Sequence, residues 1–340
     1  MVMAAFRKGR FCLLVSLVIT AAVLHYRLSI VQHAKIANTK DQNNVVDLSS
    51  QLNAPVEMEM ELDFMERMKE RMASRRRGVK DACRKLGLPT EPLDRIELIT
   101  SKKYRLAYCP VPKTGCSNMK RVMLGLNGYG NDTEQIFPKN VIGQTNLLHK
   151  AISQNLTMRS TGFPPFVVEQ QYTTFIVVRH PFERALSAYK NKLTKQWNGE
   201  PPQFMKKADY IRLRFGSPER KNATEKSPTF EEFVEYLYDA NNTNINGEDS
   251  HWNSVNVICF PCQNQYDVIA KIETIEEDLR YLLKLLGAPD SLGMPKGYSK
   301  SGKSGTDIQV DPNFKRLNQE QIKMLYQVYQ NDFKMFQYET

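Results

Sequence analysis

The sequence predicts an α/β fold with a central, mostly parallel sheet flanked by helices. Two strand–loop–helix units support this prediction, one in residues 104–126 and one in residues 175–193. The second unit opens with an uninterrupted apolar strand, Phe175-Ile-Val-Val178, which is typical of a strand covered by helices on both faces. In such sheets, ligands bind in loops at the carboxyl ends of strands, and both units place a loop there.

The individual elements follow from apolar spacing and from turn residues. Residues 104–111 are short, aromatic-rich and closed by Pro112, which predicts a strand. A helical face follows it and ends at Asn127-Gly128; its apolar positions are Met119, Val122, Met123 and Leu126. After the strand at 175–178, the spacing of Phe182, Ala185, Leu186, Tyr189 and Leu193 predicts a helix to about Leu193. Further helices are expected at residues 229–238, 274–286 and 318–336.

The N-terminus predicts a signal anchor. Arg7, Lys8 and Arg10 precede an uncharged apolar run at residues 11–26, which as a helix would cover about 24 Å. That is slightly short of a typical hydrocarbon core of about 30 Å and suits a thin membrane of the early secretory pathway. Because positive charge is denser before the run, residues 1–10 form a cytosolic tail and the remainder is luminal. A cleaved signal peptide is the alternative, since Ala21 and Ala22 end the run.

Charge and sequons then narrow the class of partner. The net charge of +10 over 340 residues favours an anionic partner: nucleic acid, an anionic membrane or an acidic polymer. Downstream of the apolar run, N-glycosylation sequons begin at Asn131, Asn155, Asn222 and Asn241. They indicate a luminal chain and argue against a nuclear nucleic-acid binder.

The luminal cysteines indicate disulfides. In an oxidising lumen, disulfides are the default for Cys83, Cys109, Cys116, Cys259 and Cys262. The C-x-x-C pair at 259 and 262 has no second Cys or His pair at zinc spacing, so a structural disulfide role is favoured over metal binding or redox exchange. The pairing is open, and the odd cysteine is either a free thiol or an intermolecular bridge.

The region before the predicted catalytic domain is expected to be a luminal stem, residues 27–95. Residues 27–56 are polar and without strong period, as in a flexible stem. Residues 57–77 predict a helix with Met58, Leu62, Met65 and Met72 near one face and with acidic residues leading basic ones. This helix would be a stem helix or a short self-association segment. The run Arg75-Arg-Arg77 is expected to be its solvated end. The catalytic domain would occupy residues 96–340.

Two loops carry the candidate chemistry. The first, Pro112-Lys-Thr-Gly-Cys-Ser-Asn118, combines a lysine, a glycine, hydroxyls and a helix start, which suits a phosphate or sulfate group. It lacks the nucleotide pattern G-x-x-x-x-G-K-[ST], and a capped turn with a surface lysine is the alternative.

The second loop is Arg179-His-Pro-Phe-Glu-Arg-Ala-Leu-Ser187. The Arg179 guanidinium could clamp a phosphate bidentately, with Ser187 within reach of the same group. Glu183 and Arg184 could form a local ion pair. Two such loops on adjacent strand ends imply a ligand with two separated anionic groups.

The two loops resemble the donor-binding motifs of sulfotransferases: PKTGCSN resembles the 5′-phosphosulfate loop, and RHPFERALSAY resembles the 3′-phosphate motif. Four further stretches resemble the Golgi carbohydrate sulfotransferases of the HNK-1 type: His251-Trp252, Cys259-Phe-Pro-Cys262, Tyr266-Asp267 and Lys271-Ile-Glu-Thr274. The ending LYQVYQNDFKMFQYE is also similar. The resemblance covers residues 65–340, more weakly before 100 and over 130–170. It is closest to the N-acetylgalactosamine 4-O-sulfotransferases, especially the chondroitin enzymes, on the approach RRR-x₅-C and the GCSN loop.

The resemblance implies a P-loop-like sulfotransferase fold and the donor 3′-phosphoadenosine 5′-phosphosulfate, with no metal. Carried over by motif, the first loop would surround the 5′-phosphosulfate: Pro112, Lys113, Thr114, Gly115, Cys116, Ser117 and Asn118. The second would bind the 3′-phosphate, chiefly through Arg179 and Ser187: Arg179, His180, Pro181, Phe182, Glu183, Arg184, Ala185, Leu186 and Ser187. Lys113 would stabilise the oxygen left by the departing sulfuryl group. His251 is the candidate general base; it could instead pack or bind sugar, and His149, His180 or a carboxylate are alternatives.

The acceptor is expected to be a polyanionic glycan. A basic stretch with interleaved aromatic residues could bind it: Lys206, Lys207, Arg212, Arg214, Arg220 and Lys221, with Tyr210 and Phe215. The predicted acceptor is the 4-hydroxyl of N-acetylgalactosamine in chondroitin or dermatan. Alternatives are terminal N-acetylgalactosamine or glucuronic acid of glycoproteins or glycolipids, a non-catalytic luminal glycan-binding protein, and a P-loop kinase-like enzyme. The predicted location is the Golgi membrane, with no nucleic-acid partner.

Overall fold

The computed structural model describes residues 48–91, 95–138, 144–194, 202–221, 227–242, 249–295 and 311–340, with backbone alone for 48–56, 145, 202 and 241–242. The predicted tail, the predicted anchor at 11–26 and the stem residues 27–47 lie outside these ranges. Within them, no helix is both long and apolar enough to cross a bilayer. Residues up to Arg67 form one compact unit, and Met68–Thr340 form the other.

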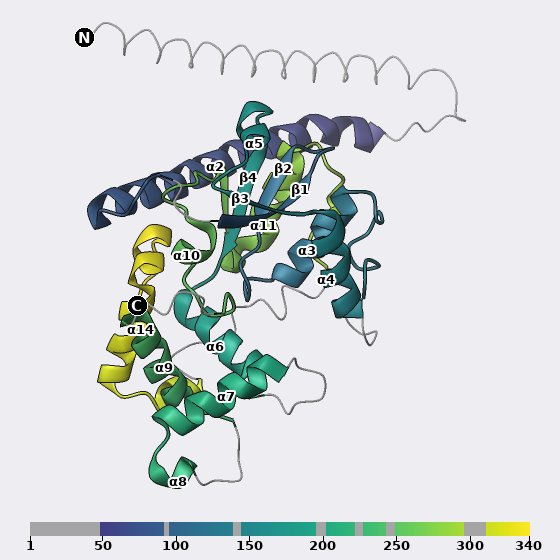
Figure 1. The fold of residues 1–340 in the computed structure, drawn as a ribbon. Coiled ribbons are helices and arrows are strands. Elements are labelled where there is room, and N and C mark those ends of the chain that lie inside the picture. The colour runs from purple at the N-terminus through teal and green to yellow at the C-terminus, as the bar shows by residue number, and fades with distance from the viewer. Residues whose placement is uncertain are drawn as a thin grey trace, which may run out of the picture. The chain divides into compact units, whose positions relative to one another are not determined.

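The second unit is built on a five-stranded sheet in the order β3-β1-β2-β4-β5 (Figure 1). The strands are β1 (Arg95–Ser101), β2 (Leu106–Cys109), β3 (Thr157–Thr161), β4 (Thr173–Val178) and β5 (Val268–Lys271). β2, β4 and β5 pair in parallel, while β1 is antiparallel to both β2 and β3. Only β1 therefore runs against the other strands of this sheet, and the predicted α/β class with a mostly parallel sheet is confirmed.

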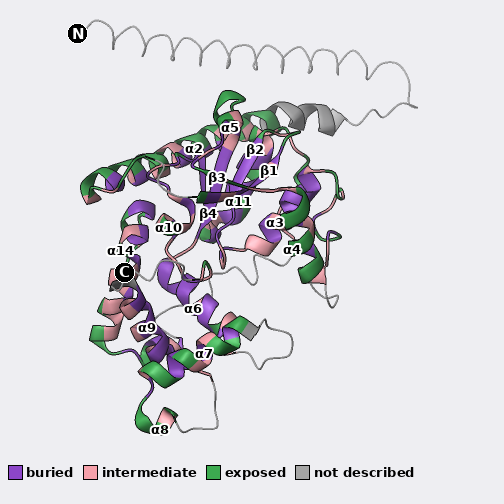
Figure 2. Cartoon of the chain, viewed as in Figure 1, coloured by how far each residue is buried: buried purple, intermediate pink, exposed green. Residues whose placement is uncertain are grey.

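The two predicted strand–loop–helix units are present. β2 leads into α3 (Cys116–Leu126), and β4 leads into α6 (Pro181–Lys192). The first strand is shorter than predicted because residues 102–105 form a turn, in which Arg105 has a positive φ of 46°. Every residue of β2 is buried, as are the last five of β4, so this pair forms the centre of the sheet (Figure 2).

The three later helices also lie where they are expected: α9 (Phe230–Asn242), α11 (Ile275–Leu285) and α14 (Gln319–Phe336). α14 starts with a capping box in which Asn318 and Gln321 exchange side-chain and backbone hydrogen bonds. The remaining elements are α4 (Gln144–Asn155), α5 (Pro165–Glu169), α7 (Pro202–Phe215), α8 (Pro218–Lys221), α10 (Val255–Cys259), α13 (Pro312–Lys315), η1 (Ile272–Thr274) and η2 (Asp290–Leu292).

The apolar core has two main parts. One is an aromatic-rich cluster contributed by α6, α7, α9 and α14, and it encloses Trp252. The other lies between the sheet and residues of α2 (Leu48–Leu86), α10 and α14, and it includes both disulfides. α6 contacts α9 and α14 and is separated from the end of β4 by two residues, so the helical cluster is attached to the sheet at the carboxyl end of that strand.

Helix α2 (Leu48–Leu86) is longer than the predicted helix at 57–77 and begins inside the predicted aperiodic stem. Its residues from Met68 belong to the second compact unit, so the predicted boundary near 95 falls inside that unit. The expectation that Arg75-Arg-Arg77 is a solvated helix end is wrong for Arg75, which is largely buried, whereas Arg76 and Arg77 are exposed; the helix itself continues to Leu86. Arg75 donates to Ile269 O and to Asp278 Oδ2, both at 2.7 Å, and Arg76 donates to Asp267 O at 2.5 Å. Since β5 is an edge strand, these arginines satisfy carbonyls in and just before it.

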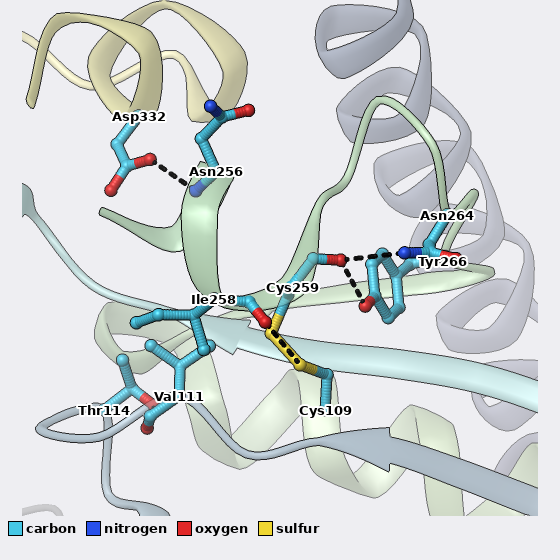
Figure 3. The surroundings of a disulfide bond; sticks show 9 residues. All are labelled: Cys109, Val111, Thr114, Asn256, Ile258, Cys259, Asn264, Tyr266 and Asp332. Carbon is cyan, nitrogen blue, oxygen red and sulfur yellow. Dashed lines mark hydrogen bonds between the residues drawn. A yellow bond between two sulfur atoms is a disulfide. The ribbon is translucent and has the colours of Figure 1, made fainter. Parts of the chain in front are cut away.

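The cysteines form two long-range disulfides, Cys83–Cys262 and Cys109–Cys259, with Cα separations of 5.7 and 6.0 Å. The two cysteines of the C-x-x-C motif therefore bind different partners, which confirms a structural disulfide role. Figure 3 shows the second bridge, where Tyr266 Oη donates to Cys259 O at 2.8 Å. Cys116 is a free thiol in the structure.

Removing the first bridge should lower stability. Cys83 and Cys262 are 179 residues apart in sequence. Closing a loop of that size lowers the conformational entropy of the unfolded chain, which stabilises the folded protein by about 5 kcal/mol at most. We expect the Cys83→Ser/Cys262→Ser variant to lose about 2–5 kcal/mol of unfolding free energy in urea denaturation. Cys116→Ser is the matched control, because it keeps both bridges. An unchanged urea midpoint in the double variant would contradict this account.

Candidate active site

The loop between β2 and α3 is shaped by two left-handed residues. Lys113 has φ 70° and Gly115, at the N-cap of α3, has φ 77°. Between them, Thr114 is fully buried and its hydroxyl donates to Val111 O at 2.9 Å, so this side chain maintains the loop. The resulting turn aims the amino end of an eleven-residue helix at the edge of the sheet, an arrangement that suits an anionic group.

The two predicted loops meet. β2 and β4 are adjacent parallel strands, and Arg179 Nη1 donates to Lys113 O at 3.4 Å. Lys113 Nζ in turn donates to Asn191 Oδ1 on α6 at 2.9 Å. The two loops therefore meet at the carboxyl edge of the sheet, where the Arg179 guanidinium contacts the backbone of Lys113.

Arg179 is oriented by an internal carboxylate. Its Nε donates to Glu183 Oε2 at 3.1 Å, and both side chains are largely buried, with 17% and 8% exposed. The predicted ion pair between Glu183 and Arg184 is wrong, because Glu183 turns back to Arg179. This contact holds the planar guanidinium in one orientation before any ligand binds.

Arg184 has a different role from the predicted one. It is fully buried and donates to the carbonyls of His251 at 3.4 Å, Trp252 at 3.5 Å and Asn253. Its guanidinium also lies over the Tyr329 ring, 5.7 Å from the centroid. The prediction that Arg184 binds the donor is therefore corrected: it fixes the segment that carries His251 against α6.

Other residues of the second motif serve the fold. The side chains of Phe182, Ala185 and Leu186 are buried in the helical core, which corrects their prediction as ligand-lining side chains. His180 contacts the C-terminal segment through Nε2 and Glu339 O at 2.9 Å, while its backbone N–H donates to Glu273 Oε1. Pro181 is also buried, and it starts α6. Ser187 is half-buried one turn before Asn191.

His251 forms a pair with a carboxylate that the sequence analysis missed. Asp249 Oδ1 accepts from the His251 backbone N–H at 2.8 Å and contacts His251 Nδ1 at 2.5 Å. Burial opposes the charge of Asp249, but the hydrogen bonds from His251 outweigh it and hold the pKa of that carboxyl below its usual value. An ionised carboxylate only accepts, so Nδ1 carries a proton, and in the neutral ring Nε2 is then the nitrogen with the lone pair. The D-x-H spacing at 249–251 was the available sequence signal.

His149 and His180, the other two histidines that the structure describes, have their ring proton on Nε2 rather than on Nδ1. Lys120 Nζ lies 2.9 Å from His149 Nδ1, and since an ammonium only donates, the ring proton of His149 is on Nε2. Burial, and then Lys120, lower the pKa of His149 to about 4. His180 directs Nε2 to a carbonyl, which makes that nitrogen a donor too. Of the histidines that the structure describes, His251 alone has Nε2 arranged to accept a proton.

The predicted basic stretch is not one acceptor surface. Arg212 is buried and donates to the carbonyls of Arg220 and Lys221, and Arg220 pairs with Glu232 at 3.1 Å. Lys207 donates to Tyr236 Oη at 2.9 Å. Exposed basic side chains in this stretch are Lys206, Arg214 and Lys221. Lys192 is a cation close to His251. Its Nζ lies 4.5 Å from the ring centroid of Phe204, and that ring contacts the His251 ring edge-on.

Two of the sequon asparagines are accessible. Asn131 and Asn155 are exposed, Asn222 lies outside the described residues, and Asn241 is described by backbone alone. No group of three or more His, Cys, Asp or Glu side chains in the described ranges is placed to hold a metal ion.

A mostly parallel sheet with two cationic loops at its carboxyl edge, and a carboxylate-paired histidine whose segment Arg184 holds against α6, are features expected of a group-transfer protein for an anionic donor. The chain matches the Sulfotransferase family over residues 96–339, and it belongs to that family.

The curated relatives that the chain matches are also sulfotransferases. Carbohydrate sulfotransferase 11 of Rattus norvegicus is 35% identical over 282 residues, covering 78% of this chain and 75% of its own. Carbohydrate sulfotransferase 9 of Homo sapiens is 31% identical, covering 80% and 60%, and carbohydrate sulfotransferase 10 of Xenopus laevis is 31% identical, covering 72% and 68%. No solved structure matches the chain.

The two arginines of the second motif should respond differently to substitution. Arg184→Gln leaves three carbonyls without their buried donor, and we expect a loss of about 3–5 kcal/mol of unfolding free energy in urea denaturation. Arg179→Gln should lower the urea midpoint less than Arg184→Gln, because the amide can still donate to Glu183, and it should weaken binding of adenosine 3′,5′-bisphosphate in calorimetry. The reverse pattern would overturn these assignments.

Proposed function

We propose that this chain transfers a sulfuryl group from 3′-phosphoadenosine 5′-phosphosulfate to a hydroxyl of a glycan. The observation that carries the proposal is the contact between Arg179 and the Lys113 carbonyl, which joins two anion-binding loops at one edge of the sheet. The 5′-phosphosulfate would lie against Lys113 and the amino end of α3. The 3′-phosphate would lie against Arg179, which precedes α6, and Ser187, which is on α6.

The residues present fit an in-line displacement. The S–O bond to the 5′-phosphate breaks while a new S–O bond forms to the acceptor oxygen. Lys113, held by Asn191, stabilises negative charge on the phosphate oxygen that is left. The acceptor hydroxyl gives its proton to Nε2 of His251, and Asp249 stabilises the imidazolium that results.

We further propose that the acceptor is the 4-hydroxyl of N-acetylgalactosamine in chondroitin or dermatan. The GCSN loop and the RRR-x₅-C approach support this subgroup. Lys120 and Lys192 also support an acidic polymer, because both raise the positive potential around His149. Terminal N-acetylgalactosamine or glucuronic acid is the alternative acceptor.

We also propose that the chain is a single-pass type II protein of the Golgi membrane with a luminal catalytic domain. The apolar run at 11–26, the basic residues before it and the four sequons support this proposal. The two disulfides are in keeping with an oxidising compartment.

The test of activity is incubation of the chain with ³⁵S-labelled donor and a panel of desulfated chondroitin, dermatan, terminal N-acetylgalactosamine and glucuronic acid glycans. Disaccharide analysis of the product then identifies the ring position. We expect label at the 4-position of N-acetylgalactosamine in chondroitin or dermatan. Label on another panel member would replace the acceptor proposal, and binding without transfer to any member would show a non-catalytic glycan-binding protein.

Loss of the leaving-group contact should reduce the rate of transfer. We expect Lys113→Ala to lower kcat by about 10²–10³-fold, because the charge on the departing phosphate oxygen loses its ammonium. Asn191→Ala should have a smaller effect of the same kind. Initial rates at saturating acceptor measure both, and a wild-type rate in Lys113→Ala would remove this residue from the mechanism.

The histidines can be separated by their pH profiles. His251→Gln should lower kcat by about 10²-fold or more, and Asp249→Asn should also lower it because the amide no longer fixes the proton on Nδ1. His149 is neutral at all pH values well above about 4. His149→Gln should therefore leave the shape of the kcat profile between about pH 5.5 and 8 unchanged. Loss of the acidic limb in His149→Gln, with retention in His251→Gln, would transfer the role of base to His149.

A further inference from the structure

Helix α2 carries an acidic end with exposed apolar side chains. In residues 57–66, the exposed acidic residues include Glu59, Asp63 and Glu66. Met58 and Leu62 lie one helical turn apart and are 63% and 65% exposed. Residues four positions apart lie on the same side of a helix, so these two side chains form one exposed apolar pair beside the acidic ones.

The other end of α2 borders a basic groove. A cavity of about 770 Å³ is lined by α2 and by residues 261–266, and it is distinct from the donor loops, which follow β2 and β4. Its rim holds four exposed cationic side chains and no acidic ones: Arg76, Arg77, Lys80 and Arg84. Its floor is apolar, with Val79, Leu88, Pro261, Ile269 and the Cys83–Cys262 bridge.

The two ends of α2 lie on one stripe of the helix. The positions recur with alternating steps of four and three residues: Glu59, Asp63, Glu66, Glu70, Ala73, Arg77, Lys80 and Arg84. This is the period of a helix–helix contact line. All but Ala73 are exposed, and the stripe changes from acidic to basic at its centre.

The stripe is complementary to itself when it is reversed. Counted inward from both ends, Glu59 faces Arg84, Asp63 faces Lys80, Glu66 faces Arg77, and Glu70 faces Ala73. A two-fold axis makes each of these contacts twice, which is the arrangement of an isologous dimer. The exposed pairs within one chain, Arg67–Asp63 at 2.9 Å and Arg77–Glu70 at 2.6 Å, contribute little and can be exchanged for pairs between chains.

We propose that two copies of this chain associate through an antiparallel pairing of their α2 helices. Residues 57–66 of each copy lie over the basic groove of the other, with Met58 and Leu62 on the apolar floor and the acidic side chains on the rim. The occupant of the groove is thus a second copy of the chain.

The test uses two charge-reversed variants of the full-length chain in a mild detergent, with mass measured by sedimentation velocity. Lys80→Glu/Arg84→Glu makes the stripe acidic at both ends, and Glu59→Lys/Asp63→Lys makes it basic at both ends. We expect wild type to be a dimer, and each variant alone to have a dissociation constant raised by about tenfold or more. A one-to-one mixture of the two variants should restore dimers, because each then faces the opposite charge.

Lys85→Glu is the matched control, since Lys85 is exposed on the same helix but does not line the groove. It should sediment as wild type, and circular dichroism should show that all variants are folded. A monomeric wild type, or a mixture that remains monomeric, would overturn the proposal. So would unchanged sedimentation of Lys80→Glu/Arg84→Glu together with weaker binding to chondroitin, because the groove would then be a glycan site.

Discussion

The buried guanidinium of Arg184 is the interaction on which the catalytic arrangement depends. A charge without exposed surface has to be compensated by dipoles and by an opposite charge, and here the dipoles are the carbonyls of residues 251–253. The carboxyl that interacts with it electrostatically is Asp332 on α14: burial raises the pKa of Asp332 above its usual value, although Arg184 and the amides of Val255 and Asn256 act to lower it. The result is one polar network that connects α6, α10, α14 and the segment of His251. The helix that presents Arg179 and the histidine that would take the acceptor proton are thereby fixed to each other.

Two histidines of the same intrinsic chemistry become a donor and an acceptor through their neighbours. His149 meets an ammonium and His251 meets a carboxylate, so their ring protons are on opposite nitrogens. Neither assignment requires a large structural difference, because a single contact to Nδ1 decides each tautomer. The surroundings of each histidine thus decide whether its Nε2 donates or accepts a proton, as the surroundings of paired groups in enzymes decide which is the acid and which the base.

Much of the fold and part of the site could be predicted from local sequence. The apolar run at 175–178, the helical spacing after Gly115 and the helix expected at 318–336 each depend on residues close together in the sequence, and the structure has the corresponding elements. The meeting of the two loops followed from the parallel order of strands. Arg184, Arg75 and Arg212 were misjudged because their partners are carbonyls, or a distant aspartate, that a residue pattern does not display. The cysteine pairing was open for the same reason, since each C-x-x-C sulfur binds a partner from a different part of the chain.

The two disulfides also set an order on biosynthesis. Cys83 and Cys109 precede their partners by 179 and 150 residues. At a synthesis rate of about 5–20 residues per second, both thiols wait roughly 10–30 s before Cys259 and Cys262 follow them. During that interval, the thiol of Cys116 is a competing partner only seven positions from Cys109. The loop Pro112–Asn118 starts three residues after Cys109, so its final geometry depends on a bridge whose second cysteine is synthesised 150 residues after the first.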